Sequence, residues 1–247
     1  MVEHKGGCPV KRDSLLLTLC VCLLGLGVWL GAERVQSAVS ATASNEWVLV
    51  IDAGHGGEDG GASTASGKKE SEINLEIALK MESLMGFLGV NTHLTRQDDR
   101  SLHSGDAKTL HEKKVSDLKN RVAEVNSFSN AFLLSIHQNY FPDSKSDGAQ
   151  VFFNDGDVSR QWGEGTQAIL RQVLDETNGR AAKPVPSNIY LFEHVNCPAI
   201  LVECGFLSNG AEASLLQTDV YQRKIVLALA GAYLQEIQMI PTVWGGT

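Results

Sequence analysis

The segment VLVIDAGHGGEDGG, Val48–Gly61, joins a run of apolar residues to a turn that contains five glycines. A short apolar run that stops at a polar, glycine-rich turn is typical of a buried strand in an α/β protein, where functional groups follow the carboxyl end of the strand. His55 lies at the centre of this turn. The turn alone leaves three roles open: a phosphate-binding loop, a structural turn or a metal ligand.

A phosphate-binding loop fits this segment poorly. Gly54 and Gly56 match a dinucleotide-binding pattern, but Asp59 occupies the position of its third glycine. Residues 67–69, Gly-Lys-Lys, lack the serine or threonine that ends a P-loop. Glu58 and Asp59 would also repel a phosphate. These features disfavour phosphate binding.

Beyond this turn, short apolar runs alternate with longer segments of helical periodicity. The apolar runs predict strands at Val48–Asp52, Thr92–Thr95, Ala131–Ile136, Ala149–Phe153 and Ala199–Val202, and the periodic segments predict helices at Ile73–Leu88, Leu118–Phe128, Ser159–Thr177 and Val220–Ile237. This alternation predicts an α/β sandwich, with helices flanking a mostly parallel sheet.

Three of the predicted strands end in polar motifs. The first ends in DAGHGG with His55, another in SIHQN with His137, and the last in VECGFLSN with Glu203. If these strands are parallel neighbours, the three side chains converge on one edge of the sheet. Zinc binds imidazole and carboxylate, so a third ligand is expected from Glu70 or Glu72 before the next helix. Because no H-E-x-x-H motif is present, spacing alone does not decide between metal ligands and structural histidines.

Glu203 follows an apolar run, where an unpaired carboxylate is costly to bury. It is therefore either a general base in a catalytic site or the partner of Arg96 or Arg121 in an ion pair. A cysteine nucleophile at Cys204, with His137 as its base, is a further alternative. A thiol between a strand end and a glycine is expected to be buried, which disfavours this alternative.

The N-terminal part of the chain predicts export. Residues 14–32 are apolar and uncharged, and Lys5, Lys11 and Arg12 precede them. A segment of this length can just span a bilayer, and the basic residues keep its N-terminal end in the cytoplasm. The segment is either a retained membrane anchor or a signal peptide cleaved near Val39–Ala41, and the distance to that site favours the anchor.

The predicted organisation has four parts: residues 1–32 (basic stub plus signal or anchor), 33–46 (linker), 47–238 (folded domain) and 239–247 (C-terminal tail). Only Cys197 and Cys204 lie outside the leader, too few for a disulfide framework. The net charge of −8, without a basic cluster, argues against nucleic-acid binding.

Five ordered blocks resemble the zinc-dependent N-acetylmuramoyl-L-alanine amidases of the AmiC-like family: VIDAGHGGEDGGA, KESEINLEIALKM, TRQDD, SIHQN and PAILVECGFLSN. The resemblance runs from Trp47 to about Ile237. It implies a single α/β domain with about six strands, one zinc ion, and a peptidoglycan substrate cut between muramic acid and L-alanine.

The same resemblance implies roles for individual residues. His55, Glu70 and His137 match the zinc ligands, and Glu203 matches the catalytic glutamate. Glu70 is preferred to Glu72 because it stands four residues before an asparagine, as in the family's E-x-x-x-N-L block.

Substrate contacts are expected at the rim from Asn139, Asn209 and Arg96. The resemblance also allows for an activator protein that helps to load the metal or uncover the site. A catalytically silent peptidoglycan-binding domain is an alternative that the presence of all four chemical residues disfavours.

The segment Ser101–Val122 is longer than in general family members and resembles that of the germination-specific amidases of endospore formers. This finer resemblance implies removal of peptides from spore cortex, which allows muramic-δ-lactam to form, in the space around the forespore. General wall turnover is the alternative. The loop Gln97–Asp117 is expected to be a lid or a partner surface, and its histidines, His103 and His111, are expected to be solvated.

Overall fold

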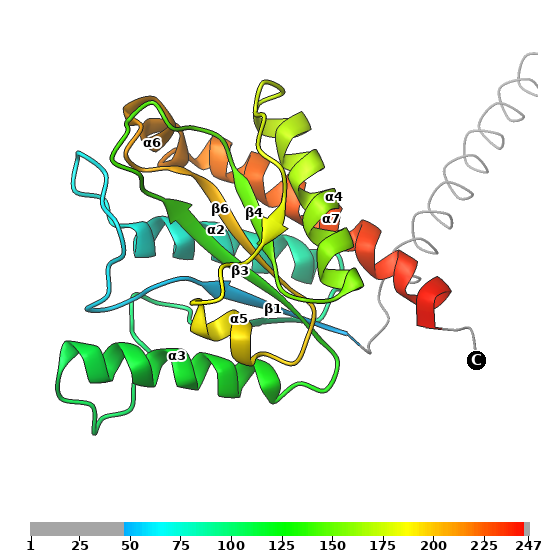
Figure 1. Cartoon of the computed structure of the whole chain (residues 1–247), viewed down its shortest axis with the longest axis horizontal. Helices are drawn as coiled ribbons and strands as arrows, with labels where there is room; N and C mark the ends of the chain where they lie inside the picture. The colour runs from blue at the N-terminus through cyan, green and yellow to red at the C-terminus, as the bar shows by residue number, and fades with distance from the viewer. Residues whose placement is uncertain (1–46, 245–247) are drawn as a thin grey trace, which may run out of the picture. The chain divides into compact units, whose positions relative to one another are not determined.

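A six-stranded sheet forms the centre of the computed structural model, which describes residues 47–244 (Figure 1). The strands are β1 (Val48–Ala53), β2 (Thr92–Leu94), β3 (Ala131–Asn139), β4 (Gln150–Phe153), β5 (Lys183–Pro184) and β6 (Ala199–Phe206). Their order is β2-β1-β3-β6-β4-β5. The first four in this order are parallel, whereas β4 is antiparallel to β6 and β5 is parallel to β4. The predicted α/β fold with a mostly parallel sheet is confirmed.

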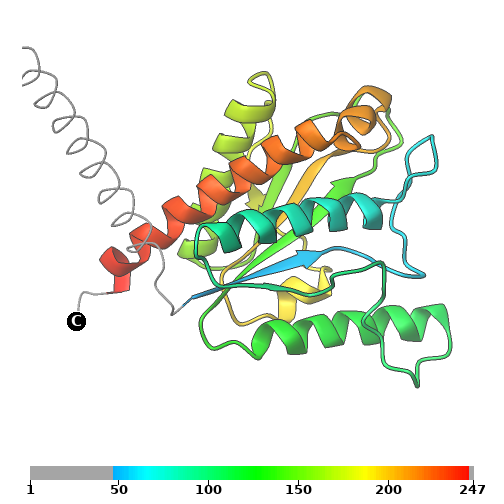
Figure 2. The ribbon, with the colours of Figure 1, turned by 180° about the vertical axis from the view of Figure 1, so that it is seen from behind.

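Helices cover both faces of this sheet. One face carries α2 (Glu70–Phe87), α4 (Asp157–Leu174) and α7 (Asp219–Trp244), and the opposite face carries α3 (Leu110–Asn126) and α5 (Tyr190–His194). The view from behind shows α2 and α7 running across their face (Figure 2). The short helix α6 (Gly210–Leu216) follows β6. Within residues 47–244, no helix is long and apolar enough to cross a bilayer. The predicted anchor and linker lie outside the described residues.

Burial on both faces of the sheet explains why the sequence of β1 is continuously apolar. Leu49 and Ile51 pack into the core beneath α2, α4 and α7, whereas Val50 packs beneath α3 and α5. All three are 0% exposed. Successive side chains of a strand point to opposite faces, so a strand covered on both sides needs apolar residues at every position. Asp52 continues the α3 side, and this places a carboxylate inside the protein.

The predicted helix Leu118–Phe128 is too short at its N-terminal end. Helix α3 begins at Leu110, where the Thr109 side chain accepts from the Glu112 amide and the Glu112 side chain accepts from the Thr109 amide. This capping box starts the helix although its first turns carry few apolar residues. About half of the expected loop Gln97–Asp117 is therefore helical or caps a helix.

Other differences concern short or terminal elements. The sequence pattern did not reveal β5, α5 or α6, which span only a few residues each. Helix α7 continues to Trp244, so the predicted domain boundary at residue 238 falls within this helix.

Candidate metal centre

The carboxyl ends of β1, β3 and β6 lie side by side, because β3 pairs in parallel with both neighbours. His137 on β3 is the direct register partner of Glu203 on β6. His55 follows β1 by two residues. The structure thus brings together at one edge the three side chains whose convergence was predicted from their strands.

His55, Glu70 and His137 form a compact group of metal-binding atoms. Their ligand atoms lie within 4.8 Å of one another. Glu70 Oε1 is 3.3 Å from His55 Nε2 and 3.0 Å from His137 Nδ1. The two imidazole rings meet edge to face, with centroids 5.0 Å apart. Two imidazoles and a carboxylate are donors that zinc takes in catalytic sites, so this group can hold a metal ion.

Backbone amides fix the Glu70 carboxylate at the start of α2. Its Oε1 accepts from the Gln138 amide at 3.1 Å and its Oε2 accepts from the Ala62 amide at 3.0 Å. Glu70 is 4% exposed. The other sequence candidate, Glu72, instead pairs with Lys68 at 2.9 Å. Of the two carboxylates, only Glu70 faces the histidines.

The side chains around His55 favour the positively charged form of its imidazole. Burial lowers the pKa of its imidazole, but hydrogen bonds to Asp59 and Glu70 outweigh burial and raise the pKa to about 9. The Asp59 contact joins Nδ1 to a carboxylate oxygen at 3.1 Å. The electrostatics of the group therefore favour a positive charge between these side chains.

Zinc affinity should accordingly weaken as the pH falls. The proton on His55 must leave before the imidazole can bind a metal. Between about pH 8 and about pH 6, both below the raised pKa, release of one proton costs about tenfold in affinity per pH unit. Competition with a chromophoric chelator measures this slope. An affinity that does not change over this range would contradict the assignment of His55.

Glu203 lies beside the group and is not part of it. Burial, together with the neighbouring Glu70 charge, raises the pKa of its carboxyl to about 6, against the opposing effect of the two histidines. Its Oε2 is buried and has no hydrogen-bond partner among the described residues. The predicted alternative, an ion pair of Glu203 with Arg96 or Arg121, is wrong, because both arginines bond elsewhere. Glu203 is half-buried, and leaving its buried Oε2 without a partner is costly for the fold. Such a group needs an explanation, and a catalytic role is one.

The absence of a side chain at Gly54 makes room for the His137 ring. A Cβ at this position would lie 2.1 Å from His137 Nε2. We expect Gly54→Ala to displace the ring, lower the free energy of unfolding by about 1–3 kcal/mol and weaken zinc binding. Chemical denaturation and zinc titration measure both effects. Gly105→Ala is the control, since nothing lies within 4 Å of a Cβ there; equal effects of the two substitutions would contradict the steric role.

The three predicted substrate contacts have different surroundings. Asn139 is half-buried at the end of β3, near the group. The Asn209 side chain caps α6 by accepting from the amides of Ala211 and Glu212. Arg96 is 0% exposed and donates to backbone carbonyls. The prediction of Arg96 at the substrate rim is therefore contradicted, because its guanidinium is not accessible.

The cysteine alternative is also wrong. Cys204 is 0% exposed, and burial raises the pKa of its thiol, which opposes formation of the nucleophilic thiolate. Cys197 and Cys204 are both free thiols.

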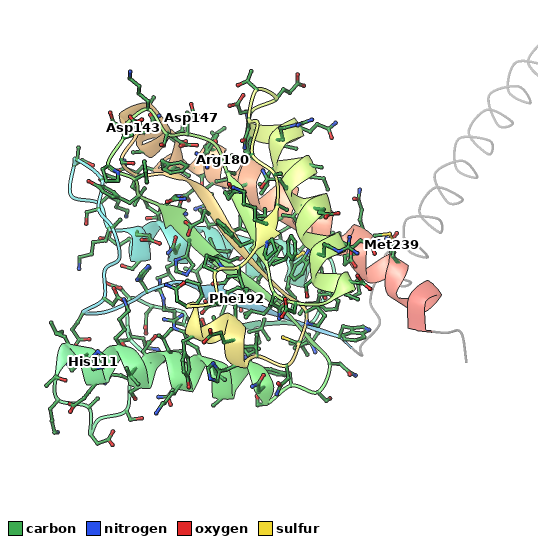
Figure 3. The ribbon with its side chains drawn as sticks, viewed as in Figure 1. His111, Asp143, Asp147, Arg180, Phe192 and Met239 are labelled. Carbon is green, nitrogen blue, oxygen red and sulfur yellow. The ribbon has the colours of Figure 1, made fainter. Side chains whose placement is uncertain are left out.

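The two histidines that were expected to be solvated differ in exposure. His111 is exposed on α3, as expected (Figure 3). His103 is partly buried, with its Nε2 3.7 Å from Glu58 Oε2.

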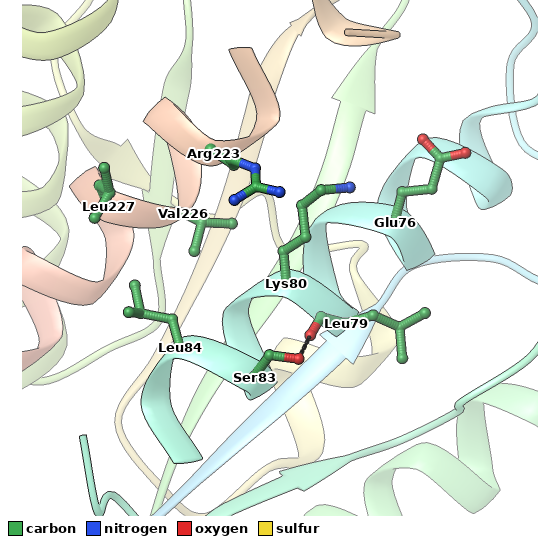
Figure 4. Close-up of a pocket in the computed structure, with 8 residues that line it drawn as sticks. All are labelled: Glu76, Leu79, Lys80, Ser83, Leu84, Arg223, Val226 and Leu227. Carbon is green, nitrogen blue, oxygen red and sulfur yellow. Dashed lines mark hydrogen bonds between the residues drawn. The ribbon is translucent and has the colours of Figure 1, made fainter. Parts of the chain in front are cut away.

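A pocket of about 180 Å³ opens beside His55, with the first turns of α3 as one wall, including Lys113 and Lys114. A larger groove of about 610 Å³ lies between α2 and α7, where Lys80 and Leu84 face Val226 (Figure 4). None of the residues that line this groove belongs to the ligand group. Of the ligand group, His55 lines the smaller pocket.

Comparison with known proteins identifies the family. Residues 49–234 match the N-acetylmuramoyl-L-alanine amidase family. The chain belongs to this family. The amidase is 35% identical over 184 residues to the germination-specific N-acetylmuramoyl-L-alanine amidase of Bacillus subtilis, covering 74% of this chain and 76% of the relative. The predicted family and activity are confirmed, and this family implies dependence on zinc.

Solved structures of related amidases share the fold. The CwlD amidase of Clostridioides difficile, solved in complex with the GerS lipoprotein, is 38% identical to this amidase, with a TM-score of 0.75 over 78% of this chain and 98% of that chain. The catalytic domain of the amidase CwlV from Bacillus (Paenibacillus) polymyxa is 27% identical, with a TM-score of 0.62 over 76% of this chain and 96% of that chain.

Proposed function

We propose that the amidase holds one zinc ion through His55, Glu70 and His137, and hydrolyses the amide between N-acetylmuramic acid and L-alanine with Glu203 as general base. One observation carries this proposal: two imidazoles and a carboxylate converge within 4.8 Å beside a buried carboxylate oxygen without a partner. This arrangement pairs a metal site with a base that is free to take a proton.

Glu203 moves the proton in this reaction. Bound zinc lowers the pKa of water and polarises the amide carbonyl. As the water oxygen forms its bond to the carbonyl carbon, Glu203 accepts the water proton. It then donates this proton to the nitrogen of L-alanine as the carbon–nitrogen bond breaks, because an unprotonated amine is a very poor leaving group. A pKa of about 6 suits a group that must both accept and donate near neutral pH.

The test is release of peptide from purified muropeptides. Removing the metal with a chelator should abolish release, and adding zinc back should restore it. Magnesium should not restore it, because this ion prefers an oxygen-rich octahedral site. Full activity of protein shown to be free of metal would overturn the zinc proposal.

We further propose that the substrate is spore cortex, so that removal of the peptide allows muramic-δ-lactam to form. The support is the similarity to the germination-specific amidase of Bacillus subtilis, together with the resemblance of the segment Ser101–Val122 to that of germination-specific amidases. In the source organism, spores of a deletion strain should lack the lactam, and the wild-type gene but not a Glu203→Gln gene should restore it. Lactam in the deletion spores would favour the alternative, general wall turnover.

The apolar residues 14–32 support a proposal of export, with this segment either retained as a membrane anchor or cleaved as a signal peptide. Cell fractionation distinguishes the two, because only the anchored protein should be found with the membranes. An activator protein is proposed on the strength of the Clostridioides difficile complex with a lipoprotein. Zinc content of the purified amidase, alone and with candidate lipoproteins, tests this proposal. Full loading of the isolated amidase would argue against an activator that supplies or retains the metal.

A further inference from the structure

The backbone of His55 is held in an uncommon conformation. Its φ is 62°, and it is the only residue other than glycine with a positive φ in the part of the chain that the structure describes. Such a conformation costs an ordinary side chain of order 1–3 kcal/mol and persists only where the surroundings impose it. The surroundings that hold His55 therefore help to aim its imidazole at the ligand group.

Two buried guanidinium groups donate hydrogen bonds to the three consecutive backbone carbonyls of residues 53–55. The Ala53 carbonyl accepts from Arg96 Nε at 2.9 Å and from Arg121 Nη1 at 3.0 Å. The Gly54 carbonyl accepts from Arg96 Nη2 at 3.1 Å. The His55 carbonyl accepts from Arg121 Nη2 at 2.7 Å. Of these two arginines, Arg121 is the one that reaches the peptide of the ligand itself.

Arg121 is in turn fixed within the core beneath α3. It is 2% exposed, and its Nη1 donates to Asp52 Oδ1 at 2.5 Å while its Nε donates to Asp117 Oδ2 at 2.7 Å. The second oxygen of Asp52 accepts from Ser135 at 2.7 Å. The planar fork of a guanidinium meets carboxylates and carbonyls at the same time, whereas a lysine ammonium has no such fork. The carboxylates therefore aim Arg121 at the His55 carbonyl.

The loop before α3 closes the other side of the same turn. A Cβ on Gly56 would lie 2.2 Å from the Arg100 carbonyl oxygen, and one on Gly57 would lie 2.8 Å from the Ser101 nitrogen. The Gly57 amide also donates to Asp99 Oδ1 at 3.0 Å. The residues after His55 thus pack directly against backbone, and a shift of the His55 peptide would disturb this packing.

We propose that Arg121 is a positioning residue for the metal centre: its hydrogen bond to the His55 carbonyl fixes the ligand in the conformation that binding requires. This inference rests on the proposed zinc site. It assigns a role in metal affinity to a side chain on α3 that touches neither metal nor substrate. A residue that only stabilised the fold would change the free energy of unfolding and leave the affinity of the folded protein unchanged.

Two variants separate these roles. Arg121→Lys keeps the charge beside Asp52 and loses the fork. The double variant Asp52→Asn/Arg121→Met removes both members of the buried pair, so that Asp52 is not left as an unpaired charge in the core. Asp117 keeps its bonds to Ser101 and the Leu102 amide. Both variants should bind zinc about 10–100-fold more weakly than the wild type, as found for partners that orient metal ligands. Competition with a chromophoric chelator gives the dissociation constant without an activity measurement.

Asn154→Ala is the matched control. This side chain bonds the Cys197 carbonyl at 3.1 Å and the Ala199 amide at 3.0 Å, at the N-terminal end of β6. The control should lose stability but keep its zinc affinity within about twofold. Equal loss of affinity in the control would show that general loosening is responsible, and wild-type affinity in folded Arg121 variants would also overturn the inference. If the wild type itself binds no zinc, the proposed function fails instead.

Discussion

Glu203→Gln should lower the rate of peptide release by about 10²–10⁴-fold, the usual contribution of a general acid–base group. Glutamine has nearly the same shape as glutamate but cannot accept and return a proton. The Oε2 of Glu203 is buried and has no hydrogen-bond partner among the described residues. Under the proposed mechanism, loss of proton transfer should therefore lower the rate, while the fold loses no ion pair.

Zinc content of the same preparation is the control for this variant. Glu203 is not in the ligand group, so Glu203→Gln should retain one zinc ion per chain. Peptide release is measured with matched zinc content in both proteins. A rate within about threefold of the wild type would remove Glu203 from the reaction.

Glu70→Ala should raise the dissociation constant for zinc by at least about 10²-fold, which exceeds the effect of most residues that only orient ligands. The substitution removes the carboxylate that bridges His55 and His137. It also leaves the amides of Ala62 and Gln138 without their acceptor, at a cost of about 1–3 kcal/mol each. Zinc titration gives the affinity, and circular dichroism checks that the variant remains folded.

Glu72→Ala provides a matched comparison two residues along the same helix. Its carboxylate pairs with Lys68 at the surface and contacts neither histidine. This variant should keep wild-type zinc affinity, and removal of an exposed ion pair costs about 0–1 kcal/mol. Equal loss of zinc in the Glu70 and Glu72 variants would show that Glu70 is not a specific ligand.

The central part of the fold could be predicted because its physical signals are local. Strands buried on both faces need continuous apolar runs, and three such runs end at His55, His137 and Glu203. Parallel pairing then brings these ends together without further information. The sequence could not show that β4 is antiparallel to β6, because an apolar run has no direction.

The remaining errors also have physical causes. The first turns of α3 are mostly charged, so apolar periodicity missed them, although the spacing of Thr109 and Glu112 is a capping-box signal that could have located the start. Arg96 and Arg121 are buried by bonding to carbonyls of an irregular turn. A sequence does not reveal which carbonyls a turn leaves free, so these two arginines were expected at the surface or beside Glu203.

The most direct test follows the oxygen of water during the reaction. The zinc-loaded amidase is incubated with muropeptides in water enriched in oxygen-18, and the products are separated and analysed by mass spectrometry. We predict one heavy oxygen in the lactyl carboxylate of muramic acid and an unlabelled peptide with a free N-terminal L-alanine. A heavy oxygen on a sugar carbon or in a carboxyl group of the peptide would contradict hydrolysis of this amide bond.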